Sequence, residues 1–230
     1  MQTLALDTST PDGSVAFRRD GHLVTARAGD GTRPHATRLP GELLALLAAN
    51  HATLADVTLL AVGLGPGAFT GLRVGIATMQ GLAVATGLPL VGVSGLDALA
   101  VAAARVTGTH DGRVIGVLLD ASRGEVFAAR YRVDPSAAVG VTPLESPVAT
   151  VPTLVLDTWR DHAWPDTWIG SATKNPALPD LGGQHVEAPI LAPLVAELAE
   201  RRRGAGGAFS PHALQPMYVR RPDVEVARER

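Results

Sequence analysis

The chain has 230 residues, of which 46% are hydrophobic and 18% charged, and its formal net charge is −2. This composition is typical of a folded globular protein with one large or two small domains, and it provides no basic surface for unaided nucleic-acid binding. The sequence contains no cysteine, which excludes disulfides, cysteine-ligated metals and a thiol nucleophile. A strand is expected just after Met1 and no apolar run approaches roughly 18 residues, so we expect a cytoplasmic protein without signal peptide or membrane span.

The first half of the chain predicts alternating strands and helices. A buried strand over residues 3–6 ends at Asp7, and two more strands are expected over 13–17 and 21–27. A helix follows from about residue 35 or 40 to residue 50, because leucines recur there on one face. The remaining expected elements are a strand over 57–62, a glycine-rich loop, a helix over 70–86, a strand over 90–93 and a helix over 94–105.

The second half partly repeats the first. An apolar strand over residues 114–119 ends at Asp120, and a turn with serine and glycine leads to another strand, as after Asp7. Weak strands are expected near 139–141 and 167–170, and helices over 153–161 and 193–203. We therefore predict two α/β domains, 1–107 and 108–230, with the last helix able to pack back on the first domain.

The segment from Gly63 to Gly75 resembles a phosphate-binding loop that leads into a helix. Such loops bind anions through free backbone N–H groups at the helix start. The P-loop motif also needs a lysine, and the only lysine in the chain is Lys174. The Rossmann motif needs GxGxxG and a later acidic residue, whereas this segment has GxGxxxG and the next strand ends at Ser94. Neither nucleotide motif is present.

The helix after this loop contains three glycines, each of which costs about 1 kcal/mol relative to alanine. Ala77, Gly81 and Ala85 form a row of small residues at helical spacing, which lets another backbone approach closely. Two interpretations remain open. Both faces of the helix pack inside its own domain, or one face is buried there and the other binds a partner helix.

Candidate catalytic residues are few. Asp7 and Asp120 each end a strand, which suits a metal–phosphate site, but an aspartate at a tight turn is also ordinary turn chemistry. The seven histidines are too widely spaced for an HxxxH or HExxH metal motif. An actin-like phosphotransferase that uses Asp7 and Asp120 with Mg-ATP is one alternative function. A glycoprotease-like metallopeptidase is the other, and the histidine spacing argues against it.

Several motifs together resemble the TsaB (YeaZ) family, whose members are dimerisation subunits in the synthesis of threonylcarbamoyladenosine in tRNA. The resemblance covers nearly the whole chain, and the GPGAFTGLR stretch within residues 63–75 is its most specific part. The other matching segments are LDTS at 6–9, GLA at 81–83, SGL at 94–96, DASRGEV at 120–126 and PMYVR at 216–220. The fold that this implies is α/β, with two ribonuclease H-like (actin-like ATPase) subdomains that have mixed sheets flanked by helices.

The resemblance implies a subunit that is not an enzyme by itself. It would bind and activate a catalytic paralogue of the TsaD type, which carries the HxxxH motif, and would work with a TsaE-type ATPase. That assembly transfers threonylcarbamoyl to N6 of the adenosine beside the tRNA anticodon, so this chain would meet tRNA only through the complex. Self-association is expected when the partner is absent.

The resemblance also assigns residues to roles. The partner surface would be a helical bundle formed by about 39–48 and 70–85. Its residues would be Leu39, Leu43, Leu46, Thr70, Arg73, Val74, Ala77, Gly81 and Val84. A vestigial cofactor site would consist of Asp7, Thr8, Ser9, Gly65, Gly67 and Asp120. No catalytic residue, metal or cofactor of its own is expected, and the boundary with the partner is where the resemblance allows ATP or ADP to bind.

Overall fold

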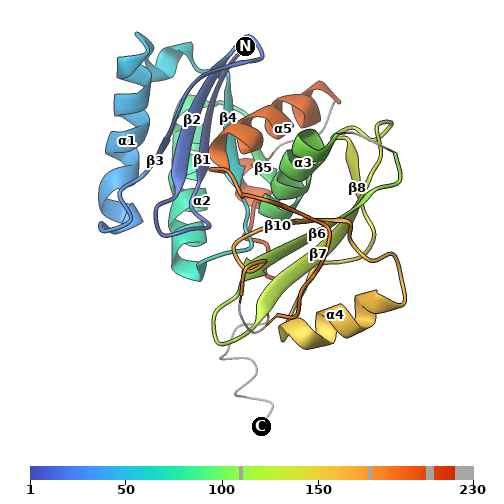
Figure 1. Ribbon diagram of the computed structural model, residues 1–230. Helices are drawn as coiled ribbons and strands as arrows, with labels where there is room; N and C mark the ends of the chain where they lie inside the picture. Colours follow the sequence, from blue (N-terminus) through green and yellow to red (C-terminus); the bar gives the residue numbers. More distant parts are fainter. Residues whose placement is uncertain (109–110, 176–177, 206–209, 221–230) are drawn as a thin grey trace. The chain divides into compact units, whose positions relative to one another are not determined.

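The computed structural model describes residues 1–108, 111–175, 178–205 and 210–220 (Figure 1). The chain divides into two compact units, of which the first contains Met1–Ala98 and Pro189–Pro216 and the second Leu99–Ala188 and Met217–Arg230. The division expected from the sequence falls at the end of helix α3 (Gly95–Thr107), whereas the boundary between the compact units falls inside that helix. Residues 109 and 110, next to the expected boundary, lie outside the described residues.

The first unit is built on a five-stranded mixed sheet of order β3-β2-β1-β4-β5. β1, β2 and β3 pair antiparallel, whereas β4 and β5 run parallel to β1. Parallel neighbours need a crossover connection, and helix α2 (Phe69–Thr86) supplies the one between β4 and β5. The strands are β1 (Gln2–Asp7), β2 (Ser14–Arg19), β3 (His22–Ala28), β4 (Leu59–Gly63) and β5 (Leu90–Val93). Because β1 and β4 are parallel, Asp7 and the glycine loop after Gly63 meet at the same edge of the sheet.

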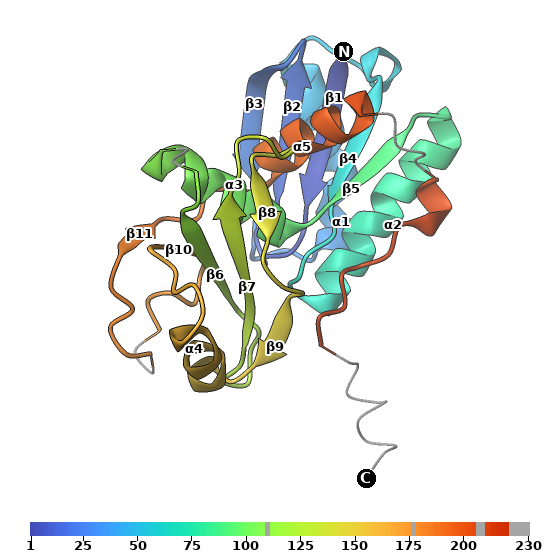
Figure 2. The ribbon, with the colours of Figure 1, turned by 90° about the vertical axis from the view of Figure 1, so that its right-hand side faces the viewer.

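Helices cover both faces of this sheet (Figures 1 and 2). α1 (His35–Ala49) and α2 (Phe69–Thr86) lie on one face, and α5 (Ala192–Gly204) lies across β1, β2, β4 and β5 on the other. Two short 3₁₀ helices, Leu54–Asp56 and Pro211–Ala213, also belong to this unit. α5 therefore joins the first sheet although it comes from late in the sequence.

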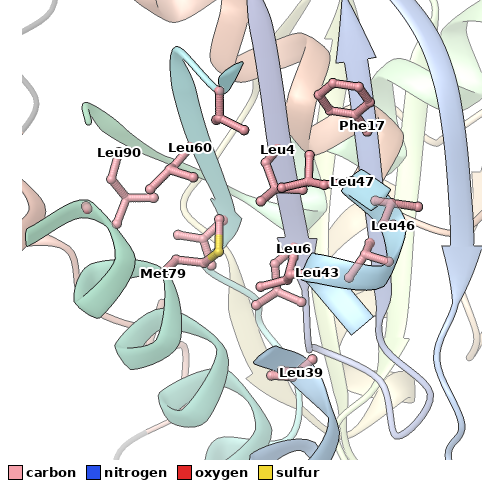
Figure 3. Packing of buried hydrophobic residues seen from close by; sticks show 14 of the residues in the cluster. Leu4, Leu6, Phe17, Leu39, Leu43, Leu46, Leu47, Leu60, Met79 and Leu90 are labelled. Carbon is pink, nitrogen blue, oxygen red and sulfur yellow. The ribbon is translucent and has the colours of Figure 1, made fainter. Parts of the chain in front are cut away.

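The core between α1, α2 and the sheet consists mainly of leucines (Figure 3). Those of α1 recur at helical spacing and are at most 2% exposed, and Met79 from α2 is fully buried beside them. Burial of a whole leucine side chain contributes about 2 kcal/mol relative to leaving it in water. The α1 members of this core are Leu39, Leu43, Leu46 and Leu47.

The second unit contains a second mixed sheet, of order β11-β10-β6-β7-β8, with β9 also paired to β7. Its central hairpin is antiparallel, like the one that opens the first unit, and β10 runs parallel to β6. Trp168 fills its core and stacks against Trp159 with ring centroids 6.2 Å apart. The elements are β6 (Val114–Asp120), β7 (Val126–Val133), β8 (Val141–Pro143), β9 (Val148–Thr150), α4 (Pro152–Arg160), β10 (Thr167–Ile169) and β11 (Gln184–Val186).

The predicted fold class is confirmed: two α/β subdomains with mixed sheets flanked by helices, each opened by an antiparallel hairpin. The expected strand near residues 139–141 begins at Val141 instead, and β9 and β11 were not expected at all. Each of these two strands has three residues, like the expected β10, but most of their residues are exposed or half-buried whereas β10 is fully buried, so neither gives an apolar signal. None of the helices in the described ranges combines the length and apolarity that crossing a bilayer requires.

Candidate functional site

The glycine-rich loop leaves β4 at Gly63 and starts α2 at Phe69, as expected. It is fixed by backbone hydrogen bonds within the first unit. Gly95 N–H donates to Gly65 O at 2.7 Å, and Ala68 N–H donates to Ser9 O at 3.1 Å. Gly65 has φ +88°, a left-handed conformation that favours glycine. The loop is thus held between the β1–β2 turn (residues 8–13) and the start of α3.

The glycines around this loop make room for the chain's own β1–β2 turn. A Cβ atom on Gly63 would lie 2.0 Å from Asp7 Oδ2, and one on Gly67 would lie 2.4 Å from Ser9 O. In the helix, a Cβ on Gly75 would lie 2.2 Å from Thr8 Oγ1. Real Cβ atoms do not approach other atoms so closely, so a side chain at any of these positions would displace Asp7, Thr8 or Ser9. Asp7, Thr8 and Ser9 therefore lie directly against the glycine loop and the start of α2.

Asp7 is buried at the centre of this arrangement, with 1% exposure. Its Oδ1 accepts hydrogen bonds from Ser9 Oγ at 2.6 Å and Ser9 N–H at 3.1 Å. Among the described residues, neither Asp7 Oδ2 nor the buried Thr8 Oγ1 has a hydrogen-bond partner. Burial raises the pKa of the Asp7 carboxyl above its ordinary value, against the opposing effect of the Ser9 hydrogen bonds and the charge of His35.

Asp120 has different surroundings in the second unit. It is exposed, its N–H donates to Ser171 Oγ at 3.0 Å, and its Oδ1 accepts from Ser122 N–H at 2.8 Å. No three His, Asp or Glu side chains gather to hold a metal ion in the parts of the chain that are described. Participation of Asp7 and Asp120 in one nucleotide site stays a prediction.

The turn after Asp120 is closed by the C-terminal segment, which sequence reasoning missed. The Arg220 guanidinium contacts the Glu125 carboxylate and donates to Ala121 O at 3.0 Å. Ser122 and Arg123 have φ of 61° and 58°, in the left-handed region that non-glycine residues seldom adopt. Arg220 packs against this turn. The sequence marked both segments as family motifs, but nothing local linked them.

α2 presents two distinct faces. Gly71, Gly75 and the apolar residues Leu72, Ile76 and Met79 face the interior of the unit. On the other face, a Cβ built on Gly81 would have no atom from elsewhere in the described residues within 4 Å, and Val84 is 60% exposed. The predicted partner residues Thr70, Arg73, Ala77, Gly81 and Val84 are exposed, and Val74 is half-buried.

Near the start of the helix, the Arg73 guanidinium lies 3.9 Å from the centroid of the exposed Phe69 ring.

α1 presents a different set of residues from the one predicted. Leu39, Leu43 and Leu46 point into the core against the sheet (Figure 3), so they are not available on the surface of this structure. The reason is their spacing, because these leucines form the apolar stripe of the amphipathic helix, and the helix packs that stripe against its own sheet. The large apolar residue that α1 exposes is Leu44, at 56% exposure. Because Leu44 lies outside the leucine stripe of α1, the sequence already indicated that it faces away from the core.

Comparisons with known proteins identify the family. The model of a family described as TsaD, tRNA N6-adenosine threonylcarbamoyltransferase, matches residues 29–141. A tRNA N6-adenosine threonylcarbamoyltransferase of Solidesulfovibrio magneticus is 30% identical over 262 residues, covering 96% of this chain and 67% of that protein.

Other relatives are more similar in length and sequence. The tRNA threonylcarbamoyladenosine biosynthesis protein TsaB of Escherichia coli is 37% identical over 183 residues, which cover 79% of this chain and 75% of that protein. The solved structure of YeaZ from Pseudomonas aeruginosa has a TM-score of 0.76 and 28% identity, and the match covers 94% of this chain and 99% of that one. Sequence and fold therefore agree over most of the length, and the chain belongs to the TsaB (YeaZ) family.

Proposed function

We propose that this chain is a non-catalytic subunit that binds a TsaD-type catalytic paralogue and activates it for threonylcarbamoyl transfer to tRNA. The proposal rests mainly on the outward faces of α1 and α2, which combine small and apolar residues. Gly81 is open to solvent, and Val84 and Leu44 are more than half exposed. A partner helix can approach the small residues closely and bury the larger ones, which is favourable at about 25 cal/mol per Å² of apolar surface.

Two further observations support a role without catalysis. The histidines of the sequence form no HxxxH pair, the motif that the family resemblance assigns to the catalytic paralogue. Asp7 and the β1–β2 turn pack directly against the glycine loop, and Asp7 is only 1% exposed. On this proposal the chain works in the cytoplasm with a TsaE-type ATPase, contacts tRNA only within the complex, and self-associates when alone. ATP or ADP would bind at the boundary with the partner, not in this chain alone.

Leu44 and Leu154 allow a matched test because both are 56% exposed, on α1 and α4 respectively. Leu44→Asp and Leu154→Asp proteins are titrated with the purified TsaD-type paralogue of the same organism by calorimetry. Threonylcarbamoyladenosine in tRNA is measured by nucleoside mass spectrometry after reconstitution. We expect Leu44→Asp to weaken binding by about tenfold or more and to lower the modification, because a carboxylate would be buried at the contact.

Leu154→Asp should leave both readouts at the wild-type level. The proposal fails if the unmodified chain neither binds the paralogue nor raises the modification above that of the paralogue alone. If Leu44→Asp and Leu154→Asp weaken binding equally, α1 does not form part of the contact with the paralogue. ATP hydrolysis by the purified chain alone is expected to stay at background, and clear turnover would favour the phosphotransferase alternative.

A further inference from the structure

The first turn of α1 lacks the usual stabilising features of a helix start. Pro34 precedes it, no side chain among the residues that the structure describes caps it by a hydrogen bond, and its first turn contains no acidic residue. Pro40 inside the helix removes one backbone N–H from the helical ladder. The position of this turn must therefore be set by contacts with other parts of the first unit.

Arg38 makes most of these contacts from a buried position, with 4% exposure. Its Nη1 donates to both oxygens of Glu42, at 2.8 and 2.7 Å. The other guanidinium nitrogens reach outside the helix, where Nε donates to Arg33 O at 3.2 Å and Nη2 donates to Pro11 O at 3.1 Å and to Asp12 O. One arginine thus joins α1 to the β1–β2 turn and to the segment before the helix.

His35 completes this connection and extends it to α2. Arg38 Nη2 lies 2.8 Å from His35 Nδ1, and His35 Nε2 lies 3.2 Å from Thr10 O. An arginine can only donate, so Nδ1 is the acceptor and shares the two Nη2 hydrogens with Pro11 O and Asp12 O, and Nε2 carries the proton that goes to Thr10 O. The ring lies against two glycines, since a Cβ on either Gly13 or Gly71 would be 3.1 Å from a ring carbon. The imidazole therefore touches the β1–β2 turn and α2 at once.

We propose that His35 and Arg38 act as a clamp that sets the position of the first turn of α1 on the β1–β2 turn and α2. Through that position they shape the α1–α2 surface, so the inference rests on the proposed function. Both are positioning residues, because Arg38 is buried and His35 contacts the interior of its own unit. The clamp works only with a neutral imidazole, since a proton on Nδ1 would remove the acceptor and place two cations in contact.

The charged groups around His35 act in both directions. Arg38 on α1 disfavours its protonation, whereas Glu42 on α1 and Asp7 at the end of β1 favour it, and Gly71 of α2 adds no charge. Burial is the largest effect and holds the pKa of the imidazole below its ordinary value of 6.5. The clamp should therefore be closed at neutral pH and open on acidification.

Three variants test the clamp: His35→Ala, which removes both contacts, His35→Asn, whose amide oxygen can accept from Arg38 without titrating, and His22→Asn as an exposed control. Affinity for the TsaD-type paralogue is measured by calorimetry from about pH 7 to about pH 5. We expect His35→Ala to weaken binding by roughly tenfold at neutral pH. His35→Asn should recover most of that loss and should remove the decrease that the wild type and His22→Asn show on acidification.

Hydrogen–deuterium exchange of the chain alone supplies a readout that does not depend on the partner. In His35→Ala, the amide of Thr37, which donates to Pro34 O at 3.1 Å, and the hydrogen-bonded amides of the turn that follows should lose protection, while those of β1 and β4 keep it. Wild-type protection of that turn would overturn the clamp, as would wild-type affinity and an unchanged pH profile in His35→Ala. If the wild-type chain fails to bind the paralogue, the proposed function fails, and the exchange result still decides whether the clamp exists.

Discussion

The Thr8 hydroxyl occupies the place that a side chain at Gly75 would need. A Cβ on Gly75 would lie 2.2 Å from Thr8 Oγ1 and 2.9 Å from Thr8 Cγ2, although Thr8 belongs to the β1–β2 turn and Gly75 to α2. Gly81, less than two turns further along α2, would have no atom from elsewhere in the part of the chain that the structure describes within 4 Å of such a Cβ. Gly75 and Gly81 of α2 therefore have two different roles. Gly75 lets the strand-end turn approach the helix, and Gly81 belongs to the face that we propose for the partner.

Gly75→Ala and Gly81→Ala should consequently have opposite effects on stability. We expect Gly75→Ala to lower the free energy of unfolding by about 1–3 kcal/mol, because a crowded interior must shift to accept the methyl group. Gly81→Ala should raise it by up to about 1 kcal/mol, the helix-propensity gain at an exposed site. Urea unfolding measures both. In the double variant, Thr8→Ala should recover much of the Gly75→Ala loss, and full additivity of the two substitutions would contradict the contact.

Asp7→Asn should change the pH dependence of stability. The folded-state pKa of Asp7 lies above the ordinary value of 3.8, so the folded chain holds this proton more tightly than the unfolded chain. The wild-type free energy of unfolding should therefore fall as pH rises from 3.8 through the folded-state pKa, and level off above it. The asparagine amide of the variant cannot ionise, so the variant should gain stability relative to wild type between acidic and neutral pH.

Chemical denaturation at a series of pH values measures that difference, with exposed Asp12→Asn as the control. A difference between Asp7→Asn and wild type that stays constant over the series would contradict burial as the main influence on this carboxyl.

Much of the fold followed from local pattern. Long apolar strands and the leucine stripe of α1 predicted their elements well, because periodicity depends only on neighbouring residues. The partners of those elements could not be predicted in the same way. The glycine penalty in α2 indicated that something approached closely, but Thr8 lies far away in the sequence. Likewise, the three-residue strands β9 and β11 depend on pairing rather than on their own sequence.

The candidate site was harder to predict for the same reason. The stripe of Leu39, Leu43 and Leu46 shows that α1 buries one face, yet the sequence alone does not say whether it packs against its own sheet or another chain. The structure places it against the sheet, and Leu44 is left outside. The contact between Arg220 and Glu125 joins residues 95 apart in the chain, and it has no local signature.

A buried ion pair links α5 to the first sheet. Arg18 on β2 donates from Nε to Glu200 Oε2 at 3.1 Å, and both side chains are less than a tenth exposed. Glu200→Ala should cost about 3 kcal/mol, because it leaves the buried guanidinium without its main carboxylate. Replacing both partners by apolar residues, Arg18→Met with Glu200→Leu, should cost less than that single substitution, since no buried charge then remains unpaired. Thermal and urea unfolding compare these variants with exposed Glu187→Ala, which should stay within about 0.5 kcal/mol of wild type. A double variant less stable than Glu200→Ala would mean that Arg18 and Glu200 supply specific stabilisation beyond the compensation of each other's charge.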